Sequence, residues 1–344
     1  MRLPKFEYIG PETLEQALDL LAQHKDDAKI LAGGTDLLVR MKKGLLQPKV
    51  LISLKGLNEL SYIKEDHDDE DGDTICIGSR TPLADIIASD FIQTHAVALS
   101  TACEKVGAVT LQHYRGTIGG NILQDTRCHH YNQSAFHRSG RQPCHKNGGK
   151  ICYARDEADR CYSTCQSDGA TALMALNAKL VLVSKGNERT VNLADFYTAD
   201  GMMPFAIESH ELLKKIIIPK TFTTSAYKRL AYRSAIDYPI VCAAVSLKTS
   251  GTTAGTTSRT TIDEARVVVG AMGRSPLYFA QASSGLKGKD ITDKDAFHAA
   301  AVQAMNSAEA FAVHNAGSTL EYRCIMVEQM VFRALEEATQ SGSV

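Results

Sequence analysis

Residues 117–168 of this 344-residue chain begin with TIGGNILQDTRC and end with RCYSTCQSD. The segment opens on a Gly-Gly-Asn turn, whose bare backbone can approach a ligand closely. It continues as a polar, basic stretch that holds five of the nine cysteines, from Cys128 to Cys165. We interpret the rest of the chain around this combination of a phosphate-type turn and a cysteine-rich loop.

An earlier stretch of the sequence also has two adjacent glycines in a predicted turn. Residues 28–44 read AKILAGGTDLLVRMKKG, so the turn at 32–36 follows a short strand-like run and leads into a helix start at Leu37. Thr35 and Asp36 are expected to cap that helix, and backbone donors at a helix start favour phosphate. An ordinary strand–helix turn is the alternative for one such motif, whereas two of them can clamp both ends of a pyrophosphate. Neither matches G-x-G-x-x-G or the P-loop pattern.

The cysteine spacing indicates an inorganic centre. Four thiols are separated by 15, 7 and 8 residues: Cys128, Cys144, Cys152 and Cys161. The residues between them show no apolar period, so burial alone is not expected to fold this segment. A [4Fe–4S] cluster fits four thiolates in a wide loop, zinc prefers closer pairs, and inert thiols are the third possibility. Cys165, three residues beyond Cys161, is an extra thiol that could compete with it.

The same segment is basic and rich in histidine. From Arg127 to Arg160 it holds seven Lys or Arg against three Asp or Glu. These cations would stabilise a negatively charged cluster and suit docking of an acidic electron carrier; a solvated loop is the alternative. His129, His130 and His145 could also be ligands, although each alone is more typical of a solvated loop.

Composition and charge narrow the class of protein. The chain is 44% hydrophobic and 22% charged, which is ordinary for a globular protein of two or three domains, and its net charge of −1 gives no reason to expect nucleic acid. No apolar run approaches the ~18 residues of a membrane span, and the first residues lack the apolar core of a signal peptide. We therefore expect a cytoplasmic protein, where structural disulfides are unfavoured.

Periodicity predicts the elements around these motifs. Helices are expected at 11–23, with Pro11 in its first turn, and at 92–106, 168–179, 294–314 and 319–338. Strands are expected at 49–54, at 180–183 and at 211–220, where Pro219 closes the strand. The acidic stretch 66–74 is expected to be a solvated hairpin loop, since the spacing of an EF-hand is missing. The polar stretch 251–261 is expected to be a mobile loop.

The two glycine motifs, AGGTDL at 32–37 and TIGGN at 117–121, resemble those of the FAD-carrying subunit of molybdenum hydroxylases, the xanthine and carbon monoxide dehydrogenase family. Nearly the whole chain shares this resemblance. It implies an α+β fold with a two-part FAD-binding domain of the vanillyl-alcohol-oxidase/PCMH type and a C-terminal α+β domain. The expected divisions are residues 1–56, 57–221 with a loop inserted at about 124–165, 222–338, and a tail at 339–344.

Within the family, QDTRCHHYNQS and the cysteine loop resemble the β subunit of 4-hydroxybenzoyl-CoA reductase. This resemblance implies a [4Fe–4S] cluster held by the four thiols named above. It also implies that 14 residues bind FAD: Leu31, Ala32, Gly33, Gly34, Thr35, Asp36, Leu37, Thr117, Ile118, Gly119, Gly120, Asn121, Asp168 and Arg229. An N-cap is the structural alternative for Asp168, and Arg229 stands where the reductase has a Lys. Arg233, Asp237 and Tyr238 are expected to order the C-terminal domain under the flavin.

The implied function is electron transfer rather than substrate chemistry. Partners would be a molybdopterin-containing large subunit and a [2Fe–2S] small subunit. In a reductase, electrons would run from ferredoxin or another carrier through [4Fe–4S] and FAD towards molybdenum, where an aryl-CoA is dehydroxylated. In a xanthine or aldehyde dehydrogenase they would run towards NAD or another acceptor, and the sequence does not decide the direction or the substrate. A zinc-stabilised binding module and a flavin oxidase acting alone are the rivals. No catalytic acid or base is predicted.

Overall fold

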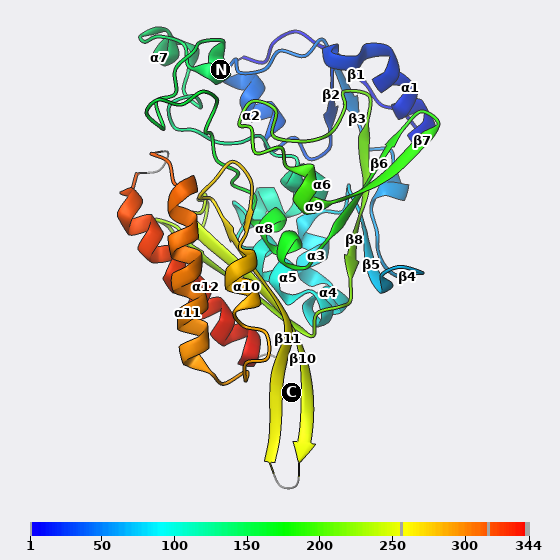
Figure 1. Cartoon of the computed structure of the whole chain (residues 1–344). Helices are drawn as coiled ribbons and strands as arrows, with labels where there is room; N and C mark the ends of the chain where they lie inside the picture. Colours follow the sequence, from blue (N-terminus) through cyan, green and yellow to red (C-terminus); the bar gives the residue numbers. More distant parts are fainter. Residues whose placement is uncertain (1, 255–256, 315–316, 341–344) are drawn as a thin grey trace.

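The computed structural model describes residues 2–254, 257–314 and 317–340. Among these residues the strands form three sheets, and helices cover them in separate groups (Figure 1). Helix and sheet are mixed in every part, which confirms the α+β class. No helix within the described residues is both long enough and apolar enough to pass through a bilayer.

The first sheet is small, parallel and N-terminal. Its part of the chain comprises β1 (Glu7–Ile9), α1 (Leu14–His24), β2 (Ala28–Leu31), α2 (Leu37–Lys42) and β3 (Val50–Ser53). The strand order is β1-β3-β2, so Ile52 lies opposite both Ile9 and Ile30. Parallel neighbours need a crossover, and α1 and α2 supply the two that are required. Ala17 and Leu21, one turn apart on α1, are buried in the core beside this sheet.

The second sheet is antiparallel. Its strands are β4 (Ile63–Asp68), β5 (Gly72–Gly78), β6 (Lys179–Ser184), β7 (Asn187–Asn192) and β8 (Leu212–Pro219), in the order β4-β5-β8-β6-β7. Side chains alternate between the faces of β6. Val181 and Val183 join the core of the first sheet, while Leu180 and Leu182 join a larger core on the helical side. This sheet is therefore buried on both faces and joins the two layers.

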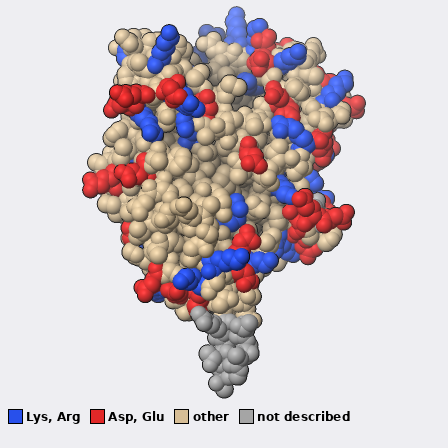
Figure 2. Space-filling view, viewed as in Figure 1, with Lys and Arg blue, Asp and Glu red and all other residues tan. Residues whose placement is uncertain are grey.

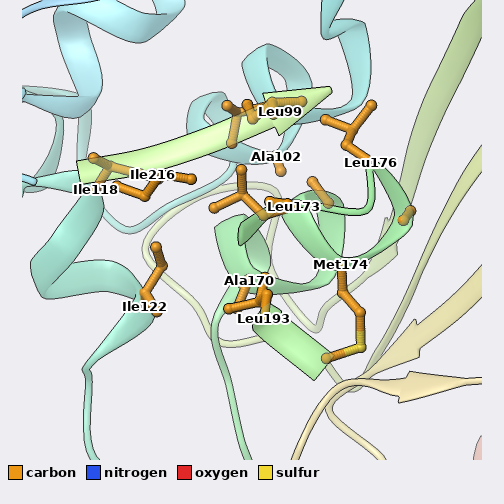
Figure 3. Close-up of a cluster of buried hydrophobic side chains, with 14 of the residues drawn as sticks. Leu99, Ala102, Ile118, Ile122, Ala170, Leu173, Met174, Leu176, Leu193 and Ile216 are labelled. Atoms are coloured by element: carbon orange, nitrogen blue, oxygen red, sulfur yellow. The ribbon is translucent and has the colours of Figure 1, made fainter. Parts of the chain in front are cut away.

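The helical layer contains a helix that is buried along its whole length. The helices are α3 (Leu83–Ala88), α4 (Asp90–His95), α5 (Val97–Glu104), α6 (Ile118–Ile122), α8 (Asp168–Ala175) and α9 (Leu193–Phe196). Figure 3 shows Leu173 of α8 among side chains from neighbouring elements, including Leu99 and Ile216. Every residue of α8 is buried, and its small residues allow close packing. The first residues of α8 are thereby fixed beside α6.

The C-terminal part is a four-stranded antiparallel sheet with helices on one face. It comprises β9 (Thr224–Leu230), β10 (Val241–Ala254), β11 (Thr257–Gly270), β12 (Leu277–Tyr278), α10 (Ala280–Ser284), α11 (Lys294–Ala308) and α12 (Leu320–Gln340). The strand order is β12-β11-β10-β9, and α11 and α12 lie side by side against the sheet (Figure 1). The hairpin of β10 and β11 extends well beyond the body of the molecule (Figure 1).

The cysteine segment has little regular structure. Besides α7 (Ala135–Ser139) and a single 3₁₀ turn at His145–Asn147, the described part of 124–165 is irregular. It packs in a small core of its own with Val313 of the C-terminal part. His314 N–H donates to the carbonyl oxygen of Ala154 (2.9 Å), and Arg155 donates to that of Ala310 (3.1 Å). The segment is thus attached to the C-terminal part as well as to the domain in which it is inserted.

Several helix limits differ from the expectation. The first helix begins at Leu14 rather than near Pro11, because the Thr13 hydroxyl caps it by accepting from Gln16 N–H. The helix expected at 92–106 is two helices, α4 and α5, separated at Ala96. The helix expected at 294–314 ends at Ala308.

The expected loops differ as well. The acidic stretch 66–74 lies mostly within β4 and β5. Residues 251–254 and 257–261 are strand rather than loop, and residues 255 and 256 lie outside the described part. Thr is β-branched and suits a strand, although no apolar alternation marks a strand in this stretch of the sequence. The last helix includes residues 339 and 340 of the expected tail, and 341–344 are not described. The expected domain limits stay a prediction.

Candidate functional site

A cavity of about 480 Å³ lies where the two glycine turns meet. Eleven of the 14 predicted FAD residues line it: Ala32, Gly33, Gly34, Thr35, Asp36, Leu37, Thr117, Gly119, Gly120, Asn121 and Asp168. The other three predicted residues do not line the cavity. Leu31 ends β2, Ile118 is fully buried in the helical core, and Arg229 contacts Asp168 from behind. The cavity volume falls in the range of small-molecule and cofactor sites, and the assignment of these residues to FAD stays a prediction.

The first glycine turn is held against the backbone that precedes the second. A Cβ added at Gly33 would lie 1.7 Å from the carbonyl oxygen of Arg115. Gly34 has a φ of 73°, in the left-handed region that disfavours other residues. Asp36 occupies the cap position of α2 but makes no capping hydrogen bond, contrary to expectation. Its carboxylate instead pairs with Arg127.

The second glycine turn is fixed by one hydrogen bond within the turn and by two to the backbone at Ser79 and Thr81. The Thr117 hydroxyl accepts from Gly120 N–H (3.1 Å), and Gly119 N–H donates to the carbonyl oxygen of Ser79 (2.9 Å). Ile118 N–H donates to the carbonyl oxygen of Thr81 (3.0 Å). A Cβ at Gly119 would lie 2.7 Å from the Ser79 oxygen, so the turn cannot tolerate a side chain there without moving. Both turns are therefore built by close backbone contact.

Asn121 connects the second turn to the start of α8. Its Oδ1 accepts from the Ser167 hydroxyl (2.7 Å) and from Gly169 N–H (3.1 Å), and all three groups are buried. Ser167 is the N-cap of α8, since its hydroxyl accepts from Ala170 N–H. The alternative that Asp168 is the cap is therefore wrong, and Asp168 is the first residue of the helix.

We expect Asn121→Ala to lower the free energy of unfolding by about 2 kcal/mol, because it leaves two buried donors without an acceptor. Thermal and urea unfolding of the flavin-free protein measure this effect. Asn187→Ala, at an exposed hairpin position, is the control and should change little. Equal stability of the two variants would show that the Asn121 hydrogen bonds contribute nothing.

Asp168 is a buried acid at the cavity wall. Its Oδ1 accepts from the Tyr227 hydroxyl, and Arg229 Nη1 lies 3.5 Å away. Burial raises the pKa of Asp168 above its ordinary value, and the Arg229 charge opposes that shift. Arg229 also donates to the carbonyl oxygens of Lys105 and Asp237. Arg229 does not line the cavity itself. It therefore positions the Asp168 side chain and the backbone at Asp237, both of which belong to lining residues.

Several lining residues escaped the sequence analysis. Ser79 Oγ and Gln166 Oε1 are buried without a hydrogen-bond partner among the described residues, so each is available to a polar ligand. Arg127 lines the cavity with its guanidinium carbon 5.3 Å from the centre of the Tyr238 ring. Arg233, Asp237 and Tyr238 also line the cavity, so they do more than order the C-terminal domain.

Three of the four predicted metal ligands share the small core of the cysteine segment, and the metal site itself stays a prediction. Cys128 forms the small core of that segment, and Cys144 and Cys152 pack against it. Cys161 is not part of that core, and its Sγ lies 3.2 Å from Ser163 Oγ. All four are free thiols. Burial raises the pKa of Cys128 to about 11 and also raises that of Cys161, so thiolates here require a compensating cation.

Cys165 is placed apart from these four. It belongs to the helical core, its N–H donates to the carbonyl oxygen of Gly273 (2.9 Å), and its side chain contacts the Tyr197 hydroxyl. It therefore does not compete with Cys161. His145 Nε2 lies 3.1 Å from the Ala158 carbonyl oxygen, and the rings of His129 and His130 lie 3.9 Å apart at an angle of 44°. Within the described residues, no group of three or more His, Cys, Asp or Glu is arranged to hold a metal ion.

Comparison with known proteins identifies the family. The model of the "FAD binding domain in molybdopterin dehydrogenase" matches residues 4–221, well over half of the chain. The chain belongs to the FAD-binding medium subunits of the molybdenum hydroxylase family. The model of the "CO dehydrogenase flavoprotein C-terminal domain" matches residues 225–338. FAD binding, an oxidoreductase subunit and the predicted fold are thus confirmed for this medium subunit.

Curated relatives and solved structures agree. The nicotinate dehydrogenase FAD-subunit of Eubacterium barkeri is 30% identical over 83% of this chain and 81% of its own. The carbon monoxide dehydrogenase medium chain of Hydrogenophaga pseudoflava is 28% identical over 97% of both. The structure of carbon monoxide dehydrogenase from the same organism superposes with a TM-score of 0.74 at 26% identity over 99% of both chains. Quinoline 2-oxidoreductase from Pseudomonas putida 86, at 20% identity and a TM-score of 0.75, shows the same fold.

Proposed function

We propose that this medium subunit carries FAD and a [4Fe–4S] cluster and transfers electrons in a complex of the 4-hydroxybenzoyl-CoA reductase type. Two observations support this proposal: one wide loop carries four thiols, three of which share a small core, and the ion pair of Arg127 with Asp36 joins this loop to the cavity. The loop that contains them has too small a core to fold by burial alone. Four thiolates supply the complete ligand set of such a cluster.

The residues at the cavity fit an FAD. The turns at 32–37 and 117–121 would hold the diphosphate with backbone N–H groups, because Gly33 and Gly119 leave no side chain in the way. Ser79 Oγ and Gln166 Oε1 offer unpartnered polar atoms to the rest of the cofactor. Asp168, held by Tyr227 and Arg229, would contact the flavin. FAD supplies a junction between two-electron and one-electron carriers.

Zinc is the competing occupant of the cysteine segment. A structural zinc ion usually takes its cysteine ligands from closely spaced pairs, whereas these four thiols are separated by 15, 7 and 8 residues. A four-iron cluster carries each thiolate on a different iron, so its ligands stand further apart than those of one ion. Four thiols spread over one wide loop therefore favour a cluster over zinc.

The proposed partners are a molybdopterin-containing large subunit and a [2Fe–2S] small subunit, with ferredoxin or another carrier as the electron donor. Electrons would pass from [4Fe–4S] to FAD, then to [2Fe–2S] and molybdenum, where an aryl-CoA is reductively dehydroxylated. The alternative is a subunit of the xanthine or aldehyde dehydrogenase type, which delivers electrons to NAD or another acceptor. An aldehyde oxidoreductase FAD-binding subunit of Escherichia coli is among the relatives, 29% identical over 72% of this chain.

Replacing one thiol separates the two cofactors. We expect anaerobically purified wild-type protein to contain about four irons and one FAD per chain, and Cys144→Ser to lose the iron while it retains most of the FAD. Iron, sulfide and flavin assays with visible spectra before and after dithionite measure both. Cys324→Ser changes a half-exposed thiol of the C-terminal helix α12 and should keep both cofactors.

Three results would contradict the proposal in different ways. FAD without iron in the wild type, even after anaerobic reconstitution, would leave a medium subunit without the extra cluster and remove the reductase assignment. Zinc without flavin would favour a binding module. Loss of both cofactors in Cys144→Ser would make the loop a folding element rather than an electron carrier.

A further inference from the structure

A buried network of five charged side chains joins the first glycine turn to the cysteine segment. Asp36 pairs with Arg127, and Asp125 N–H donates to Asp36 Oδ2 (3.4 Å). Asp125 Oδ2 lies 3.1 Å from Arg40 Nη2, and its Oδ1 lies 2.8 Å from Lys146 Nζ. The exposed fractions of these side chains lie between 8% and 21%. The network therefore has little access to solvent screening.

The two ends of the network face different groups. Asp36, Arg40 and Arg127 line the FAD cavity. Lys146 does not line it, and besides Asp125 and Thr126 its Nζ approaches Ser163, the neighbour of the Cys161 thiol. Its Nζ lies 3.4 Å from Ser163 Oγ, which in turn lies 3.2 Å from Cys161 Sγ. The ammonium group is thus at most two hydrogen-bond lengths from a thiol of the cysteine segment.

Lys146 is also the most enclosed cation of the network. Its side chain is 8% exposed, it donates to the Thr126 carbonyl oxygen (3.2 Å), and its Nζ lies 5.6 Å from the centre of the Tyr131 ring. Three cations against two carboxylates leave one positive charge in excess. A buried excess charge is costly unless an anion lies nearby. A thiolate at Cys161 would supply such an anion on the side of Lys146.

We propose that Lys146 sets the reduction potential of the cluster held by the four thiolates, with Asp125 and Ser163 fixing its position. This inference rests on the proposed function. Reduction adds one electron, drawn in the experiment from dithionite, and makes the cluster and its thiolates more negative by one charge. A fixed positive charge a few ångströms away favours the more negative state. The Ser163 hydroxyl lies 3.2 Å from Cys161 Sγ, and its donation to a ligand thiolate would act in the same direction.

The test is a redox titration of the cluster in the full chain, followed by EPR. We expect Lys146→Met to lower the equilibrium constant for reduction at least tenfold, a shift of 59 mV towards lower potential for one electron. Lys146→Arg keeps the charge and should stay close to the wild type. Lys150→Met removes an exposed lysine of the same segment and is the matched control, with no shift expected.

Iron and FAD content are measured first on every variant, so that loss of a cofactor is not mistaken for a shift in potential. Lys146→Met that contains iron and has the wild-type potential would overturn this inference alone. If Lys146→Met loses its iron, the reduction potential is measured on Ser163→Ala instead. This variant keeps every charge and removes only the hydroxyl beside Cys161. A lower potential in Ser163→Ala supports the inference, and an unchanged one overturns it. A wild-type protein without iron overturns the proposed function and this inference together.

Discussion

Gly33→Ala is expected to abolish FAD binding. The added Cβ would lie 1.7 Å from the Arg115 carbonyl oxygen and 3.1 Å from the Cα of Gly116. Both neighbours are backbone, so no side-chain rotation relieves the overlap and the two glycine turns must separate. Separation opens the cavity at the point where both turns would contact the diphosphate. We expect at least a hundredfold loss of FAD affinity and a loss of about 3 kcal/mol in the free energy of unfolding.

FAD titration of the deflavinated protein and urea unfolding measure the two effects. Gly10→Ala is the matched control, because its added Cβ would meet only Tyr8 Cε1 at 3.9 Å. It should bind FAD as the wild type does. A Gly33→Ala variant that is purified with a full complement of FAD would show that the contact between the turns is not what forms the site.

The glycine turns could be predicted from the sequence because their chemistry is local. Gly33 and Gly119 permit a close backbone approach, and that property depends on the residue itself. Asp36 shows the limit of such reasoning. Its place before α2 predicts that Asp36 caps this helix. The carboxylate instead forms an ion pair with Arg127, which lies 91 positions further along the chain. A charge partner that is distant in sequence overrides a local preference.

The rest of the cavity wall depended on tertiary packing. Ser79 and Gln166 carry no motif, and they line the cavity only because β5 and α8 bring the neighbouring chain to it. Cys161 and Cys165 illustrate the same point for the thiols. They are four positions apart, but one faces the cysteine segment and the other enters the helical core beside Tyr197. Spacing alone could not separate them.

Arg323 connects the C-terminal helix to three separate parts of the backbone. Its guanidinium donates to the carbonyl oxygens of Ile240 (3.3 Å), Val313 (2.7 Å) and Ala271 (2.6 Å). The residue is 1% exposed, and burial lowers the pKa of its guanidinium. Ala271 has a φ of 67°, a strained conformation that this hydrogen bond helps to hold. One side chain thereby satisfies three buried acceptors that have few other means of solvation.

We expect Arg323→Met to lower the free energy of unfolding by about 4 kcal/mol, because it leaves three carbonyl oxygens without this donor and replaces a fitted side chain. The effect should reach the cysteine segment. Val313 packs with Cys128 in the small core there, so release of its carbonyl should reduce iron content more than flavin content. Urea unfolding and cofactor assays measure both. Arg333→Met, on the exposed side of the same helix, is the control. A loss below about 1 kcal/mol for Arg323→Met would mean that water or a backbone shift replaces the guanidinium, and that the C-terminal part does not hold the cysteine segment in place.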